Sequence, residues 1–180
     1  LLAAQGAGLA LGLEPSDMAC LASFSGVPGR LERVPNKQGL NIFVDYAHTP
    51  DALDNVLAAL KQLEFGRLIT VFGCGGNRDR AKRPLMAGAV ARHSDVGILT
   101  SDNPRHEDPI AIMNDTRPGL TDCPMVLETP DRKKAIGMAI EEMRKNDVLV
   151  VAGKGHETYQ QIGDQKFDFS DRVVVMELLS

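Results

Sequence analysis

Features that are typical of membrane proteins and of nucleic-acid-binding proteins are missing from this sequence. None of the apolar runs in its 180 residues approaches the roughly 20 residues that a membrane-spanning helix requires. Lysine and arginine are mixed with aspartate and glutamate at a formal net charge of -4, so no basic stripe is present that could neutralise the phosphates of a nucleic acid. We therefore expect neither a membrane nor a nucleic acid as a partner.

Cysteine is scarce as well. The three cysteines, Cys20, Cys74 and Cys123, are an odd number and lie far apart, which favours neither a disulfide framework nor a zinc site. This usage is typical of the reducing cytoplasm. The sequence also lacks an initiator methionine and the charged start and cleavage site of a signal peptide. We therefore expect it to be part of a longer cytoplasmic protein.

The first 28 residues differ in pattern from the rest of the chain. Two short helices are expected there, over Leu1–Leu13 and Pro15–Phe24, and Val27-Pro28-Gly29 breaks the second one. We predict that residues 1–28 are the tail of a preceding domain. Residues 29–180 are long enough to bury one hydrophobic core and are predicted to form one domain.

From residue 30 onward, strand and helix patterns alternate. Strand-like segments at 30–34 and 40–46 flank a polar turn, which predicts an N-terminal antiparallel hairpin. Further β-like runs separated by helical patterns follow at 67–72, 96–100, 125–127 and 148–152, and one helix face is expected to consist of Leu85, Met86, Ala89 and Val90. This alternation predicts an α/β fold with a Rossmann-like, mostly parallel sheet and helices on both faces. Ligands of such sheets bind beyond the carboxyl ends of the strands.

Polar loops follow the predicted strands, so the parallel topology gathers them at one edge of the sheet. The first loop, Asp45–Pro50, places a carboxylate at a strand end, where it can accept hydrogen bonds from ribose hydroxyls or approach a magnesium ion through water. The alternative interpretation is a helix start, with Thr49 as the N-cap and His48 exposed.

The second loop is rich in glycine. Residues 73–78, Gly-Cys-Gly-Gly-Asn-Arg, resemble a phosphate-cradling loop but lack the Lys-Ser/Thr of a P-loop and the spacing of a dinucleotide-binding fingerprint. Arg78 offers a forked donor for a carboxylate or a phosphate. Cys74 is interpreted as a small packing residue, because no base adjoins it that would make it a nucleophile.

The third loop presents a carboxylate, an amide and a guanidinium on one turn. In Asp102-Asn103-Pro104-Arg105, Asp102 can receive an ammonium, Arg105 can bind a carboxylate in a fork, and Asn103 can do either. The alternative is an Asp/Asn turn fixed by proline. The sequence therefore favours a ligand with charges of both signs about as strongly as it favours a simple turn.

The remaining two segments are Gly153–Glu157 and the segment around Arg30. Gly153–Glu157 combines close backbone approach with a carboxylate, although its glycines can also serve only a positive φ at a strand end. Lys154 and His156 are expected to support the site and not to catalyse. Arg30, at the domain border, either reaches a nucleotide phosphate between two domains or is a surface charge.

Taken in order, five segments closely resemble the C-terminal domain of the Mur ligase family, and the resemblance covers nearly the whole chain: Gly29–Glu32, Asp45–Pro50, Phe72–Arg83, Asp102–Arg105 and Ala152–Glu157. It implies an ATP-dependent and Mg²⁺-dependent amide ligase that adds an amino acid to UDP-N-acetylmuramoyl-L-alanyl-D-glutamate in peptidoglycan synthesis. In such enzymes a carboxylate becomes an acyl phosphate, which the incoming amine attacks. The Asp-Asn-Pro-Arg turn resembles the branch that adds meso-2,6-diaminopimelate.

Position by position, the resemblance assigns the binding of diaminopimelate to Arg78, Asp102, Asn103, Arg105, Gly153 and Glu157, and the binding of ATP to Arg30, Asp45, His48 and Asn77. Some relatives are expected to carry aspartate in place of Asn77. The resemblance also implies that residues 1–28 end the central ATPase domain, and that the protein is a monomer in the bacterial cytoplasm.

Parts of the family's machinery are absent from this sequence. It contains no Gly-x-x-Gly-Lys-Ser/Thr loop, no candidate for a carbamylated lysine and no UDP-binding domain, and we assign no catalytic residue and no metal ligand in it. We therefore expect the isolated chain to bind the amino acid weakly and to be inactive. The alternatives are a lysine-adding or other Mur-type ligase and a non-catalytic binding module.

Overall fold

The N-terminal segment begins with one helix. The computed structural model describes residues 2–20 and 26–180, and α1 spans Leu2–Ala10. The second predicted helix, Pro15–Phe24, is wrong where it can be checked, because residues 15–18 form turns and only residues 19–20 have 3-10 geometry. Its last part, 21–24, lies outside the described residues. The turn is closed locally by Glu14, whose backbone N–H donates to the carboxylate of Asp17.

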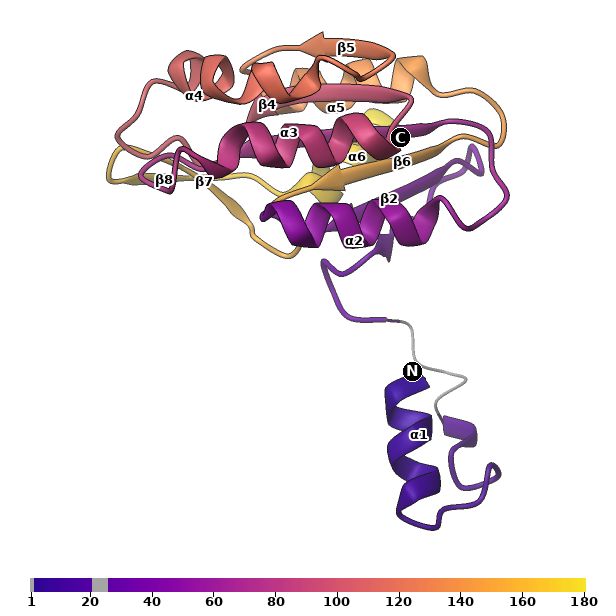
Figure 1. The fold of residues 1–180 in the computed structure, drawn as a ribbon. Coiled ribbons are helices and arrows are strands. Elements are labelled where there is room, and N and C mark those ends of the chain that lie inside the picture. Colours follow the sequence, from indigo (N-terminus) through magenta and orange to yellow (C-terminus); the bar gives the residue numbers. More distant parts are fainter. Residues whose placement is uncertain (1, 21–25) are drawn as a thin grey trace.

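A six-stranded sheet with the order β1-β2-β6-β3-β4-β5 forms the centre of the fold (Figure 1). Its strands are β1 (Glu32–Arg33), β2 (Asn41–Asp45), β3 (Leu68–Cys74), β4 (Val96–Ser101), β5 (Met125–Glu128) and β6 (Val148–Ala152). All neighbours pair in parallel except β1, which is antiparallel to β2. The predicted mostly parallel sheet and the N-terminal antiparallel hairpin are both confirmed. The strands β7 (Tyr159–Ile162) and β8 (Gln165–Asp168) form a separate antiparallel hairpin.

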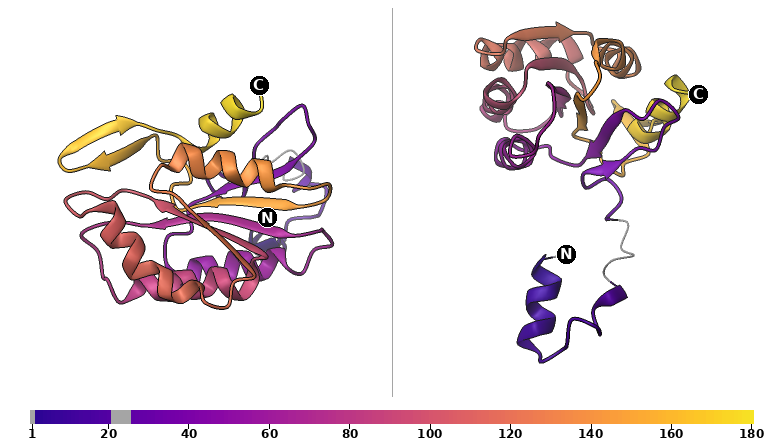
Figure 2. Two further views of the ribbon diagram at one scale, coloured as in Figure 1. Left: turned by 90° about the horizontal axis from the view of Figure 1, so that it is seen from above. Right: turned by 90° about the vertical axis from the view of Figure 1, so that its right-hand side faces the viewer.

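Helices cover both faces of the sheet, as the two views of Figure 2 show. One face packs against α2 (Pro50–Leu60), α3 (Lys82–His93) and α4 (Pro109–Thr116), which continues into a 3-10 turn at Arg117–Leu120; the other packs against α5 (Arg132–Glu142) and α6 (Asp171–Leu178). A strand covered on both sides is apolar at nearly every position. The central strands β3 and β6 are accordingly buried throughout.

Each face of the sheet has its own hydrophobic core, and β6 shows how the sequence divides between them. Val148 and Val150 belong to the core beneath α2 and α3, whereas Leu149 and Val151 belong to the core beneath α5 and α6. This is the two-residue alternation of side chains along a strand. On α3 the predicted face is wrong at one position, because Leu85 is 58% exposed on the solvent side of the helix.

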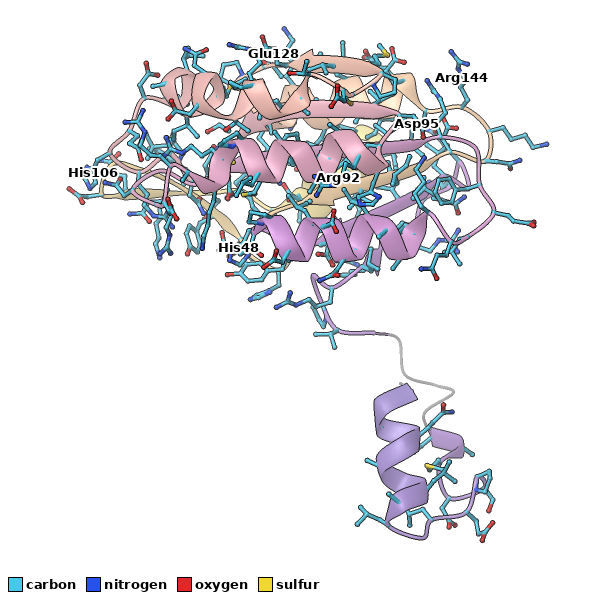
Figure 3. All side chains as sticks on the ribbon, in the orientation of Figure 1. His48, Arg92, Asp95, His106, Glu128 and Arg144 are labelled. Atoms are coloured by element: carbon cyan, nitrogen blue, oxygen red, sulfur yellow. The ribbon has the colours of Figure 1, made fainter. Side chains whose placement is uncertain are left out.

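Capping residues start the helices directly after the strands. Thr49 accepts a hydrogen bond from the backbone N–H of Ala52 at 3.2 Å, with Pro50 in the first turn, as predicted. Asp108 caps α4 and Asp131 caps α5 in the same way. The helix N-termini therefore meet the carboxyl ends of the strands at one end of the sheet. Figure 3 shows His106 at this end, opposite Asp95 and Arg144.

A fully buried ion pair joins the helices on the α5 side to the sheet. Arg132 donates from Nε and Nη2 to the two carboxylate oxygens of Asp171, both at 2.8 Å, and Nη2 also donates to the carbonyl oxygen of Ala152 at 2.9 Å. Both side chains are completely inaccessible to solvent. A charge buried this deeply is tolerated only when its partners stay in place.

Replacing Asp171 by asparagine leaves the guanidinium of Arg132 buried without its counter-ion. We expect the free energy of unfolding to fall by about 3–5 kcal/mol, as when a buried ion pair loses one partner. Urea unfolding followed by circular dichroism measures this change. Asp164→Asn is the matched control, because the Asp164 side chain is 94% exposed, and it should cost about 0.5 kcal/mol or less. Equal losses in the two variants would contradict the role of the pair.

Candidate functional site

The loops that follow β2, β3, β4 and β6 line one cavity of about 410 Å³. The predicted site residues among its lining are His48, Arg78, Asp102, Asn103, Arg105, Gly153 and Glu157. The structure thus brings together all six residues that the sequence assigns to diaminopimelate. That they bind this ligand stays a prediction.

The end of β3 and the glycine-rich loop after it pack directly against the end of β4 and the turn that follows. A Cβ atom on Gly73 would clash with the carbonyl oxygen of Thr100, and one on Gly76 would clash with that of Pro104. The backbone N–H of Gly76 donates to the carbonyl oxygen of Asn103 at 2.9 Å. Close approach of two backbones therefore explains these glycines without a phosphate.

The backbone of Arg105 is held in the left-handed region, at φ 51°. The β7–β8 hairpin fixes it there, because the N–H of Arg105 donates to Gln161 O at 3.1 Å and Gly163 N–H donates to Arg105 O at 2.6 Å. The guanidinium Nη1 donates to the carbonyl oxygen of Gly76 at 2.7 Å. This contact leaves the other guanidinium nitrogens available to a ligand carboxylate in the cavity.

Asp102, Asn103 and Glu157 surround the buried ammonium of Lys154. Its Nζ lies 2.9 Å from Asn103 Oδ1 and 3.2 Å from Asp102 Oδ1. Burial lowers the pKa of Lys154 below its usual value, and the neighbouring Asp102 carboxylate opposes this shift. Lys154 thus contacts predicted site residues from inside the protein, and its expected supporting role stays a prediction.

Two of the residues predicted to bind ATP meet around Tyr46. The guanidinium of Arg30 lies 5.0 Å from the centre of the Tyr46 ring, and His48 Nδ1 is 2.7 Å from the Tyr46 carbonyl oxygen. Arg30 and His48 are both exposed. Tyr46 and His48 line the cavity, whereas Arg30 is outside its lining and lies beside the Tyr46 ring.

The other two predicted ATP-binding residues are engaged within the protein. The buried carboxylate of Asp45 accepts the backbone N–H groups of Leu31 and Ala47, each at 2.7 Å. Asn77 Oδ1 accepts the N–H of His106 at 3.1 Å. Neither residue is among those that line the cavity. Their contact with ATP stays a prediction, and the structure does not bring Asn77 together with Arg30 and His48.

Cys74 lines the cavity but is suited to packing. Its Sγ lies 3.7 Å from the sulfur of Met86, and burial raises the pKa of its thiol to about 11. The thiol is therefore protonated at neutral pH and is a poor nucleophile. This agrees with the interpretation of Cys74 as a packing residue.

Arg83 is a functional candidate that the sequence did not single out. Its buried guanidinium lines the cavity and donates to Asp115 Oδ2 and Glu107 Oε1, both at 2.7 Å. These hydrogen bonds hold the pKa of Glu107 and of Asp115 below their usual values. The Nε atom is buried without a hydrogen-bond partner among the described residues. Its two partners are 24 and 32 residues away, so no local pattern could have revealed this cluster.

Among residues 2–20 and 26–180, no helix is both long enough and apolar enough to cross a membrane. No group of three or more His, Cys, Asp and Glu side chains there is arranged to hold a metal ion.

Comparison with known proteins places the chain in a family. Residues 29–155 match the model described as the Mur ligase, glutamate ligase domain. A relative from Lawsonia intracellularis, UDP-N-acetylmuramoyl-L-alanyl-D-glutamate--2,6-diaminopimelate ligase, is 61% identical over 179 residues. The aligned part covers 99% of this chain but only 37% of that relative.

Solved structures agree with this result. The structure of a ligase with the same name is 41% identical, with a TM-score of 0.79, and the match covers 99% of this chain and 37% of that one. A folylpolyglutamate synthase of Mycobacterium tuberculosis, complexed with ADP and AMPPCP, is 22% identical with a TM-score of 0.53 over 71% of this chain and 30% of its own, and shares the fold alone. The chain therefore belongs to the Mur ligase family and contains its C-terminal, glutamate ligase domain.

Proposed function

We propose that this chain is the amino-acid-binding part of an ATP-dependent ligase that adds meso-2,6-diaminopimelate to UDP-N-acetylmuramoyl-L-alanyl-D-glutamate in peptidoglycan biosynthesis. One observation carries the proposal. The guanidinium groups of Arg78 and Arg105 line the same cavity as the carboxylates of Asp102 and Glu157. This set of groups complements an amino acid whose distal end carries both an ammonium and a carboxylate.

The paired charges give a physical reason for selectivity against lysine. The distal end of lysine carries an ammonium but no carboxylate, so it can satisfy Asp102 and Glu157 but not the two arginines. A guanidinium that loses water and gains no partner costs free energy, and sites built on such groups reject analogues strongly. Relatives that carry this stretch of sequence are named as 2,6-diaminopimelate ligases, which supports the same substrate.

The nucleotide is proposed to bind at the other edge of the cavity. Arg30 and His48 are exposed beside Tyr46 and can meet phosphate oxygens, and Asp45 keeps the loop that carries His48 in place. ATP with Mg²⁺ supplies the activation of the acceptor carboxylate. We further propose that residues 1–28 end the ATPase domain, that the other domains bind the UDP-linked substrate, and that the ligase is a monomer in the bacterial cytoplasm.

The complete ligase should prefer diaminopimelate over lysine by about 100-fold or more in kcat/KM, because lysine leaves the arginines unpaired. Release of inorganic phosphate, measured with each amino acid at saturating ATP and UDP-linked dipeptide, gives both values. Reactions without the UDP-linked dipeptide correct for ATP hydrolysis that is not coupled to amide formation. Equal kcat/KM for the two amino acids would exclude the diaminopimelate-adding branch.

Arg105→Ala removes a charge-assisted contact to the distal carboxylate. Since such a contact contributes about 1.5–3 kcal/mol, the KM for diaminopimelate should rise by about 10- to 100-fold, with little change in the KM for ATP. Steady-state kinetics of the complete ligase separate the two constants. The control is Arg144→Ala, an exposed arginine at the opposite end of the sheet (Figure 3). A larger effect on ATP than on diaminopimelate would move Arg105 to the nucleotide site.

A further inference from the structure

A fully buried cation lies among the residues that are proposed to bind the substrate. The side chain of Lys154 is 0% exposed. Its Nζ donates hydrogen bonds to Asn103 Oδ1 and to the Tyr159 carbonyl oxygen, both at 2.9 Å. It also forms an ion pair at 3.2 Å with Asp102 Oδ1, an atom that has no hydrogen-bond partner among the described residues. An ammonium has three N–H donors and no acceptor, so its protonated form matches this set of oxygens.

We propose that Lys154 is a positioning residue for the amino-acid substrate. Lys154 does not itself need to touch the substrate. Its ammonium fixes the arrangement of Asp102, Asn103 and Glu157 and leaves this acidic half of the site with a single net negative charge. The inference rests on the proposed function and adds to it how the site keeps its charge and geometry.

The orientation of the Asn103 amide shows the geometric effect. Its Oδ1 accepts from Lys154 and from the N–H of Gln161, both at 2.9 Å. Because the ammonium and the backbone N–H of Gln161 can only donate, together they hold the amide oxygen toward them, and Nδ2 then points to Glu157 Oε2 at 3.0 Å. Lys154 therefore helps to position Glu157 through Asn103, while Oε1 of that carboxylate remains available for a ligand ammonium.

The same ammonium connects the acidic half of the site to Arg105. It donates to the carbonyl oxygen of Tyr159, where the β7–β8 hairpin begins. Two residues later, Gln161 O accepts the backbone N–H of Arg105. The Gln160 side chain donates to the carbonyl oxygen of Asp102 at 2.7 Å. The hairpin therefore contacts the turn after β4 at both of its ends, Asp102 and Arg105. A shift of Lys154 would therefore move both halves of the site.

The charge balance follows from the groups that face Lys154. Asp102 and Glu157 have carboxylate oxygens 3.2 and 3.8 Å from its Nζ. Arg132 of α5 and Asp171 of α6 also face Lys154, but their charges balance each other in the ion pair that they form. Two carboxylates and one ammonium leave one negative charge, which matches the single distal ammonium of diaminopimelate.

The test uses the complete ligase with Lys154→Met, which keeps most of the side-chain volume and removes the charge. We expect the KM for diaminopimelate to rise by about tenfold or more, because the residues that bind this substrate lose their positions. The KM for ATP should change less than about twofold. Lys145→Met, at an exposed lysine before β6, is the matched control and should leave both constants unchanged.

The two KM values separate positioning from a general structural defect. A defect in folding should change the KM for ATP and the kcat together with the KM for diaminopimelate, whereas a loss of positioning should raise the KM for diaminopimelate alone.

A Lys154→Met enzyme with an unchanged KM for diaminopimelate, or with only a lower kcat or melting temperature, would overturn the inference. If this variant does not fold, Lys154→Gln, which removes the charge and is one bond shorter, must also raise the KM for diaminopimelate; an unchanged KM there counts against the inference equally. A wild-type ligase without diaminopimelate-dependent turnover would instead refute the proposed function, and the inference with it.

Discussion

The burial of two cations at the carboxyl edge of the sheet is the constraint on which the site depends. Arg132 binds both carboxylate oxygens of Asp171 and the carbonyl oxygen of Ala152, which ties α5 and α6 to the end of β6. Lys154, two residues further along, finds its acceptors on the turn after β4 and at the start of β7. A buried charge without partners is too costly to persist. The loops that carry those partners therefore cannot move independently.

Close backbone packing adds to this rigidity. The end of β3 and the loop after it approach the end of β4 and its following turn so closely that Gly73 and Gly76 have no room for a Cβ atom. Arg105 in turn adopts a left-handed conformation that the β7–β8 hairpin holds in place. Strain of this kind persists only where the surroundings determine it. A site fixed before its ligand arrives loses less entropy on binding, which suits the proposed recognition of one small amino acid.

Patterns that act over short distances in the chain gave the correct predictions. The alternation of apolar runs and helical faces predicted the sheet, and Thr49 with Pro50 predicted the start of α2. The errors arose where context outweighs local pattern. Leu85 has the spacing of a core residue but faces solvent, and the second N-terminal helix is replaced by turns over the residues that can be checked. Arg83 was missed because its carboxylate partners lie on another helix and the loop before it.

Short segments of the sequence were enough to predict the fold class, the edge of the sheet proposed to bind ligands and the chemical groups gathered there, because periodicity and strand-end loops are local properties. Which of these groups remain available to a ligand depends on the tertiary structure. Asp45 and Asn103 are largely occupied by partners within the protein, whereas Arg105 is not. Hydrogen-bond partners far apart in the chain decide this, since a polar group buried at the site must be satisfied before any ligand arrives.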